Sequence, residues 1–148
     1  MNKLYKYQPI WSWPRSTEEF LAKQISERPI LNVCSGNSYF GDVQLDMYYI
    51  PKEWFTKSQK VKADMISLPF KDDSFGAVFC DPPWNSQQKA IVSQFLKDAI
   101  RVASVVYILS PWTIGVTYAK LTHAWVRSQP GINPALLFTR YERNNGKA

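Results

Sequence analysis

The sequence predicts an α/β fold built on a mainly parallel sheet, and three observations support this prediction. Short apolar segments end repeatedly at a glycine or an acidic residue, as strands of a parallel sheet do where they meet their loops. Segments in which apolar residues recur at helical spacing lie among these strands. One run, V-A-S-V-V-Y-I-L at 102–109, is almost continuously apolar, which is typical of a strand buried on both faces. The chain of 148 residues is expected to form a single domain.

The first part of the chain predicts an arm, a helix and two strands. Residues 1–15 are rich in aromatic side chains and interrupted by prolines, which predicts an extended arm. The tetrapeptide S-T-E-E at 16–19 matches a capping box, so a helix is expected over 17–27. Strands are predicted at 30–34 and 42–46, with the loop S-G-N-S-Y-F-G between them.

The rest of the chain continues the pattern and adds a hairpin at the end. After an aromatic connector at 47–60, further strands are predicted at 61–64, 77–80 and 102–109, and a helix is predicted at 86–101. Segments 120–127 and 135–142 predict two final strands in a hairpin-like return, so one strand near the C-terminus is expected to be antiparallel. Residues 143–148 are expected to be a frayed tail.

Composition excludes some classes of function and leaves others open. The net charge is +6, from 18 Lys and Arg against 12 Asp and Glu, which is compatible with a nucleic-acid partner and equally with ordinary solubility. With two cysteines, Cys34 and Cys80, outside any C-x-x-C pattern and one histidine, His123, no metal site is predicted. No signal peptide or membrane span is evident, so a reducing, cytoplasmic setting and no membrane partner are expected.

Four polar segments fall where predicted strands end: the loop S-G-N-S, Asp46, Asp64, and D-P-P-W at 81–84. Ligands of open α/β sheets bind outside the carboxyl ends of the strands, so these segments are expected to share one site. Two consecutive prolines supply no backbone donor and fix φ twice, which makes the turn after Asp81 stiff. A purely structural turn is the alternative explanation of this motif.

These segments together resemble the class I S-adenosylmethionine (SAM)-dependent methyltransferases. L-N-V-C-S-G-N-S at 31–38 is similar to the family's glycine loop, and the segment 63–78 is similar to its third-strand acid followed by an L-P-F…S-F link. D-P-P-W resembles the signature of methyltransferases that act on exocyclic amino groups, above all adenine N6. The resemblance covers roughly residues 30–112 and implies a Rossmann-like fold with SAM as cofactor.

The resemblance also implies a set of cofactor-binding residues. They are Cys34, Ser35, Gly36, Asn37, Asp46, Met47, Asp64, Met65 and Asp81. Gly36 allows the backbone to approach the amino-acid part of the cofactor, Asp46 can accept from ribose hydroxyls, and Asp64 can accept from the adenine amino group. The structural alternatives are a simple turn at Gly36, an exposed strand-end acid at Asp46 and a turn cap at Asp64. Met47 fits packing on adenine and plain core equally well.

For the acceptor side, the resemblance implies a catalytic set of Asp81, Pro82, Pro83 and Trp84. The Asp81 carboxylate and the Pro82 carbonyl can each accept one N–H of an amino group, which aims the nitrogen lone pair at the methyl group. Trp84 can stack on a flat acceptor, and Asn85 can bond its ring edge or cap the next helix. Trp112 is a further substrate-binding candidate, with core packing as the alternative.

One part of the usual fold is expected to be absent. Only 12 residues separate Cys34 from Asp46, too few for a loop, a full helix and a strand. We therefore expect no helix after the first strand, and the helix at 17–27 is a candidate to cover that face instead.

The expected activity is SAM-dependent N-methylation, most favourably of adenine N6 in DNA or RNA. Because 36 residues follow Trp112 and two strands use most of them, a segment that reads duplex sequence is not expected. Single-stranded nucleic acid, structured RNA or a small molecule fits better, with a second like or unlike subunit as one source of target recognition. The alternatives are a catalytically weak SAM- or nucleic-acid-binding subunit and a protein-amide or small-molecule N-methyltransferase.

Overall fold

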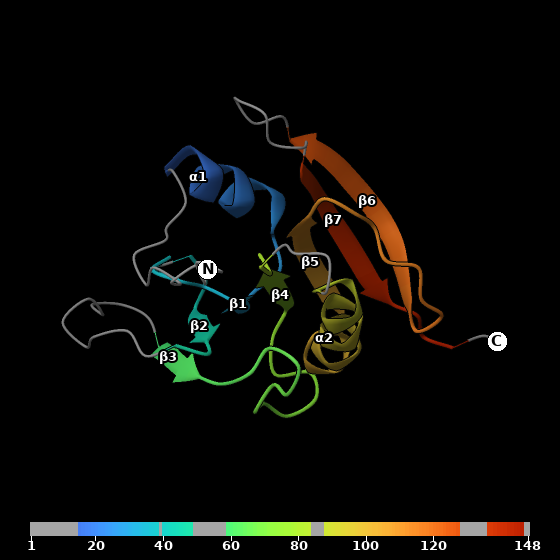
Figure 1. The fold of residues 1–148 in the computed structure, drawn as a ribbon, viewed down its shortest axis with the longest axis horizontal. Coiled ribbons are helices and arrows are strands. Elements are labelled where there is room, and N and C mark those ends of the chain that lie inside the picture. The colour runs from blue at the N-terminus through green and yellow to red at the C-terminus, as the bar shows by residue number, and fades with distance from the viewer. Residues whose placement is uncertain (1–14, 39, 49–58, 84–87, 128–135, 147–148) are drawn as a thin grey trace, which may run out of the picture.

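The computed structural model describes residues 15–38, 40–48, 59–83, 88–127 and 136–146. Within these ranges the chain forms two helices and seven strands (Figure 1). The elements in chain order are α1 (Arg15–Gln24), β1 (Ile30–Val33), β2 (Val43–Asp46), β3 (Gln59–Lys62), β4 (Ala77–Cys80), α2 (Gln88–Val102), β5 (Val105–Ser110), β6 (Ala119–Arg127) and β7 (Leu136–Arg143). Neither described helix is long and apolar enough to cross a membrane.

The strands form one sheet in the order β3-β2-β1-β4-β5-β7-β6. The pairs β3–β2, β2–β1, β1–β4 and β4–β5 are parallel, whereas β7 is antiparallel to both of its neighbours. The predicted fold class, a mainly parallel sheet with an antiparallel strand near the C-terminus, is therefore confirmed. The strand order reverses between β1 and β4, because β1 leads to β2 on one side and β4 leads to β5 on the other.

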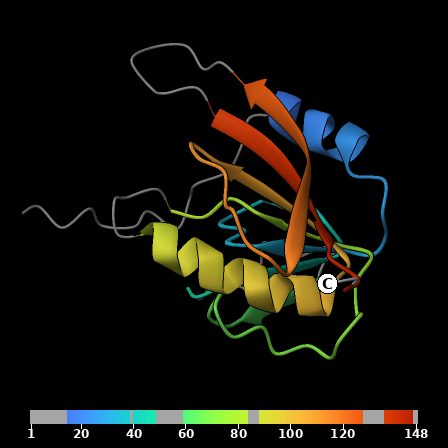
Figure 2. The same cartoon turned by 90° about the vertical axis from the view of Figure 1, so that its right-hand side faces the viewer.

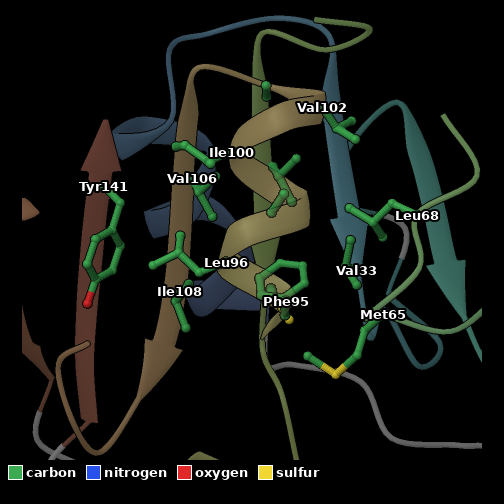
Figure 3. Packing of buried hydrophobic residues seen from close by; sticks show 14 of the residues in the cluster. Val33, Met65, Leu68, Phe95, Leu96, Ile100, Val102, Val106, Ile108 and Tyr141 are labelled. Carbon is green, nitrogen blue, oxygen red and sulfur yellow. The ribbon is translucent and has the colours of Figure 1, made fainter. Parts of the chain in front are cut away.

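The two helices cover opposite faces of the sheet, as Figure 2 shows from the side. On one face, Leu21 and Ile25 are buried against alternate residues of β1, β4, β5 and β7, among them Phe79 and Phe138. On the other face, the apolar side of α2 packs on the intervening residues, with Phe95 and Leu96 at the centre of the cluster in Figure 3. The apolar runs of β4 and β5 are explained by burial on both sides.

Handedness explains why α1 lies where it does. Right-handed connections from β1 to β2 and from β4 to β5 run in opposite directions along the sheet, so their crossovers belong on opposite faces. Helix α2 is the crossover from β4 to β5. The described residues between β1 and β2, 34–38 and 40–42, contain no helix, as predicted. Helix α1 packs on the face that a helix between β1 and β2 would cover.

Several predicted boundaries were wrong, for local reasons. Helix α1 begins at Arg15, so Ser16 lies inside the first turn and is not the predicted N-cap. Strand β3 ends at Lys62, two residues before the predicted end. The prediction failed because the strand sequence Q-K-V-K has no apolar alternation to mark its bounds. Strand β5 begins at Val105 because Val102 ends α2, and the Ala103 N–H still donates to the Ala99 carbonyl at 2.9 Å. Residues 1–14 of the predicted arm and most of the connector lie outside the described residues, and Arg15, also predicted in the arm, belongs to α1.

The long connection from β3 to β4 is fixed by the end of α2. Arg101 donates to the carbonyl oxygens of Phe70 at 2.8 Å and Leu68 at 3.2 Å, and it pairs with Asp72 at 2.8 Å. The Asp98 carboxylate accepts from the Leu68 N–H at 2.7 Å. The L-P-F…S-F link therefore has a structural function, which is to hold this connection against α2.

A polar network joins the segment after α1 to β5 and β7. The Tyr107 hydroxyl donates to Glu27 at 3.0 Å and accepts from Arg140 Nε at 3.1 Å, while Arg140 also pairs with Glu27 at 3.0 Å. Burial raises the pKa of Tyr107 to about 12. The phenol therefore stays protonated and keeps donating to Glu27 over the whole neutral range.

Replacing Gly76 by alanine should destabilise the fold by about 2–3 kcal/mol, because overpacking against backbone cannot be relieved by a rotamer change. A Cβ at this position would lie 2.4 Å from the Arg28 carbonyl oxygen. Chemical denaturation measures the change. Gly115→Ala is the matched control, since its Cβ would meet nothing within 4 Å and should change stability by less than about 1 kcal/mol. Equal effects of the two substitutions would contradict the packing argument.

The pH dependence of stability should reveal the buried phenol of Tyr107. An unfolded tyrosine ionises near pH ~10, whereas the folded pKa is about 12. The stabilisation is complete below the unfolded value and is lost as the pH rises towards the folded value. Tyr107→Phe should therefore show a shallower loss of unfolding free energy above pH ~10 than wild type, measured by urea denaturation at several pH values. Parallel curves would show that the phenol is not held neutral.

Candidate functional site

The predicted site residues converge at the carboxyl ends of β1, β2 and β4. The loop at 34–38 follows β1, Asp46 ends β2, and Asp81 directly follows β4. Since β1 pairs with both β2 and β4, these segments lie side by side at the point where the strand order reverses. Open α/β sheets bind their ligands at this point of the carboxyl edge.

The loop after β1 has an unusual backbone. Cys34 has φ 56° and Gly36 has φ 51°, both in the left-handed region that L side chains rarely adopt. The Ser35 N–H donates to the Leu45 carbonyl at 3.2 Å, and the Ser38 N–H donates to the Ser35 carbonyl at 2.9 Å. The chain therefore makes a tight turn after β1 and does not begin a helix there.

Asp46 holds this turn in place. Its Oδ2 accepts from the Gly36 N–H at 2.9 Å and its Oδ1 accepts from the Tyr48 N–H at 3.0 Å. The side chain is buried, with 5% exposed, so the alternative of an exposed strand-end acid is wrong. A carboxylate that accepts two backbone N–H bonds is a strong acceptor site, and it fixes the loops after β1 and β2 together.

Lys60 of β3 completes the support of this loop. Its ammonium donates to the Gly36 carbonyl, so both backbone groups of Gly36 are bonded. Burial lowers the pKa of Lys60, and the nearby Asp46 carboxylate acts in the opposite direction. Lys60 was not predicted in the site, although a lysine inside a strand that pairs with an acidic strand end is a signal that could have pointed to it.

Helix α1 supports the other end of the loop. The Ser38 hydroxyl donates to the Glu18 carboxylate at 2.9 Å and accepts from the Phe40 N–H at 3.0 Å. Glu18 was not predicted in the site, because the sequence gives no sign that α1 reaches this loop. Ser38 belongs to the predicted S-G-N-S loop but was given no role of its own.

Two polar atoms of the loop have no hydrogen-bond partner in the described part of the chain. They are the Ser35 hydroxyl and the Asn37 Oδ1, and both are buried. Buried polar groups are normally bonded, so orphaned ones at a strand-end loop point to a missing ligand or water. Both residues were predicted to bind cofactor.

Three sulfur atoms meet beneath the loop. The Cys34 Sγ lies 3.6 Å from the Met65 Sδ, and the Cys34 thiol also contacts the fully buried Cys80. Burial raises the pKa of the Cys80 thiol, and Cys34, Asp81 and Asp46 act in the same direction. Cys80 is therefore held as a neutral thiol. Among the described residues, no group of three or more His, Cys, Asp or Glu side chains is arranged to hold a metal ion.

Met47, Asp64 and Met65 occupy the β2 and β3 side of the edge. Met47 is 50% exposed, so plain core is excluded and its side chain is accessible to a ligand. Asp64 caps a turn, since its Oδ1 accepts from the Ile66 N–H at 3.1 Å, as one of the alternatives predicted. Met65 is 7% exposed and belongs to the core beneath the site, as its position in Figure 3 shows.

The D-P-P-W motif follows β4 at the centre of the edge. Asp81 is 9% exposed, Pro82 is buried and Pro83 is exposed. Strand β4 ends at Cys80, so the carboxylate is fixed directly beyond a strand buried on both faces. Trp84 and Asn85 lie outside the described residues, and their roles stay predictions.

Trp112 follows β5 at the same edge. Its carbonyl accepts from the Ser110 hydroxyl at 2.6 Å, and its side chain packs against the core on the α2 side. Core packing, the alternative role predicted for Trp112, therefore applies to part of its indole ring. The indole N–H is buried and has no partner within the described ranges, so a role towards a ligand stays a prediction.

Comparison with known proteins finds similarity in structure and none in sequence. No protein-family model and no curated protein matches the chain. The solved structures that match include the 1,6-didemethyltoxoflavin-N1-methyltransferase of Burkholderia thailandensis with bound 1,6-didemethyltoxoflavin and S-adenosylhomocysteine, at a TM-score of 0.66 and 11% identity over 88% of this chain and 78% of that one.

Two further matches have the same fold. The N-methyltransferase NodS of Bradyrhizobium japonicum, in complex with S-adenosylhomocysteine, matches at a TM-score of 0.63 and 7% identity, over 88% of this chain and 87% of that one. A candidate RNA methyltransferase of Pyrococcus horikoshii matches at 0.61 and 13% identity, over 90% and 83%. At these identities the matches show that the chain has the Rossmann-like fold of these methyltransferases.

Asp46→Ala should lower the free energy of unfolding by about 2–4 kcal/mol, because it leaves the Gly36 and Tyr48 N–H groups without their acceptor and the half-buried Lys60 ammonium without its nearby opposite charge. Hydrogen exchange of the Gly36 and Tyr48 amides should accelerate selectively. Asp64→Ala is the control, since it removes a partly exposed turn cap and should cost about 0.5–1 kcal/mol. Unchanged exchange at Gly36 would show that Asp46 does not hold the loop.

Proposed function

We propose that this protein is a SAM-dependent N-methyltransferase that acts on an exocyclic amino group, most favourably adenine N6 in nucleic acid. The observation that carries the proposal is the position of Asp81 and Pro82. They lie directly after β4, beside the loop after β1, where the strand order reverses.

The residues on the β1 and β2 side fit the cofactor. The unpartnered Ser35 hydroxyl and Asn37 Oδ1 suit the charged amino-acid part of SAM, and exposed Met47 suits the face of its adenine ring. Asp46 ends β2 at the same edge, which is where an acid of a dinucleotide-binding fold bonds ribose hydroxyls, so we assign it this role. When bound, SAM would supply a methyl group whose C–S bond breaks as the new C–N bond forms and the acceptor nitrogen loses a proton.

The residues after β4 suit an amino-group acceptor. An aromatic amine is a poor nucleophile because its lone pair is delocalised into the ring. The Asp81 carboxylate and the Pro82 carbonyl can each accept one N–H, which orients the lone pair and stabilises the positive charge that develops on nitrogen. Because Asp81 and Pro82 are buried at the end of a rigid strand, this orientation needs little rearrangement.

Nucleic acid is the favoured acceptor class on two grounds. The D-P-P-W motif resembles that of adenine-N6 methyltransferases, and the net charge of +6 favours a polyanion. Small molecules and protein amides are further acceptors of the same chemistry. A SAM-binding subunit with little activity of its own is the second candidate, because the described residues after β1 lack the helix whose N-terminus would assist the cofactor.

A methyl-transfer assay tests the proposal. The full chain is incubated with radiolabelled SAM and separate DNA, RNA, protein and small-molecule fractions. Label should enter nucleic acid at N6 of adenine, and Asp81→Ala should reduce the rate by at least about 10²-fold, because the amino group is no longer oriented.

Asp72→Asn provides the control. This acid is exposed, and its partner Arg101 belongs to the structural contact between α2 and the β3–β4 connection, not to the proposed site. The substitution should leave transfer unchanged. Label retained by Asp81→Ala would remove this carboxylate from the mechanism. SAM binding by calorimetry without transfer to any fraction would favour the binding subunit, and no SAM binding at all would overturn the proposal.

A further inference from the structure

A strip of aromatic and basic side chains lies on the outer part of the sheet, away from the site already described. It consists of His123, Trp125 and Arg127 of β6 together with Phe20 of α1, and we call it the β6 strip. These β6 residues pair with Arg140, Phe138 and Leu136 of β7, on the face that α1 covers. The hairpin of β6 and β7 extends along the edge of the molecule in Figure 1.

The rings of the strip are stacked and accessible. The imidazole of His123 is parallel to the indole of Trp125, with ring centres 5.4 Å apart and an angle of 9°. Trp125 in turn lies against Phe138, with ring centres 5.3 Å apart. Trp125 therefore extends the core, whereas exposed His123 adds a flat ring on the outer side that core packing does not require.

Arg127 provides a cation with unused donors. Its guanidinium lies over the Phe20 ring at 4.7 Å, and its Nη1 is buried and has no hydrogen-bond partner in the described part of the chain. No ion pair between described residues includes Arg127. A buried guanidinium nitrogen without an acceptor is costly, so an anionic ligand is the expected partner.

The register of the sheet brings the strip level with the proposed acceptor site. Cys80 pairs with Ile108, Ile108 with Thr139, and Thr139 with Ala124, so these residues form one row across the sheet. Asp81 is the next residue after Cys80, and Trp125 is the next residue after Ala124, so both lie one residue beyond this row. Arg127 lies two residues further, beyond the carboxyl end of β5.

Three strand spacings separate β4 from β6 in the order β4-β5-β7-β6. At about 4.8 Å per spacing, Asp81 and the strip are roughly 14 Å apart. This span corresponds to about four nucleotides at a charge spacing of about 3.4 Å along a stacked strand.

We propose that the β6 strip binds single-stranded nucleic acid whose target adenine occupies the Asp81 site, with a base about four nucleotides away stacked on His123 and a phosphate of the same segment on Arg127. This inference rests on the proposed function and names its substrate as a single strand. In a duplex the base faces are already stacked, so only unpaired bases can stack on an exposed imidazole. Aromatic rings beside a cation are the usual means of binding a single strand.

His123 offers a direct test, because it is the only histidine in the chain. Proton NMR of the full chain with an adenine-containing 12-nucleotide single strand should show an upfield shift of the His123 ring protons. The titration is done once with DNA and once with RNA. The nucleic acid that binds more tightly shows whether the strip prefers deoxyribose or ribose. An unshifted His123 signal at saturating oligonucleotide would overturn the proposal.

Binding measured by fluorescence anisotropy adds a second test that does not depend on catalysis. Arg127→Gln should weaken binding about 5- to 50-fold and reduce the slope of log K against log salt by about 0.7. Lys120→Gln is the matched control. It removes the same charge from an exposed position at the other end of β6, about 24 Å along the strand, and should have a much smaller effect. Equal effects of the two variants would indicate non-specific attraction and would overturn the proposal.

His123→Ala separates the strip from the proposed function. It should weaken single-strand binding about 5- to 100-fold while leaving SAM binding unchanged. If wild type binds the single strand through His123 and Arg127 yet transfers no methyl group, the strip stands and the proposed function fails. If wild type methylates a nucleic acid and neither variant changes its KM, the function stands and the strip fails.

Discussion

The hydrogen bonds of a single buried carboxylate hold the candidate site together. Asp46 accepts from the Gly36 N–H and the Tyr48 N–H, and so fixes the loops after two neighbouring strands. Lys60 bonds the Gly36 carbonyl from β3, and Glu18 holds Ser38 from α1. In many open α/β sheets, the loop after the first strand leads into a helix whose first turn orders it. Here side chains from three separate elements order the loop instead, and they leave Ser35 and Asn37 with unused polar atoms.

Helix α1 explains how the sheet stays covered although no helix is described between β1 and β2. Its apolar residues bury the face opposite α2, and the network of Glu27, Tyr107 and Arg140 fastens its end to β5 and β7. In the same helix, Glu18 accepts a hydrogen bond from the loop after β1, and Phe20 supplies the ring on which the Arg127 guanidinium lies. One helix thus connects the loop after β1 with the outer hairpin, so its packing is expected to matter for both.

The carboxyl edge of the sheet divides into two halves at the reversal between β1 and β4. The β1 and β2 half offers a loop held by hydrogen bonds, the buried Asp46 carboxylate and the unpartnered polar atoms of Ser35 and Asn37, which suit a polar ligand. The β4 half offers Asp81 and two prolines and continues across β5 and β7 to the aromatic and basic strip of β6. This arrangement fits a reaction between a small donor and a longer, anionic acceptor, since each half presents the matching chemistry.

The sequence by itself determined the fold class, the order of the strands along the chain, the lack of a helix in the described residues between β1 and β2, and the acids Asp46 and Asp81 at the ends of β2 and β4. These features depend on local periodicity and spacing, which the sequence records directly. Only the tertiary structure decided that Lys60 and Glu18 support the glycine loop, that Asp46 is buried, and that His123, Trp125 and Arg127 lie level with Asp81. These facts arise from strand register and from the packing of α1 on the sheet. Lys60 and Glu18 lie 24 and 20 positions from the loop residues that they bond, so they reach the loop only once the chain has folded.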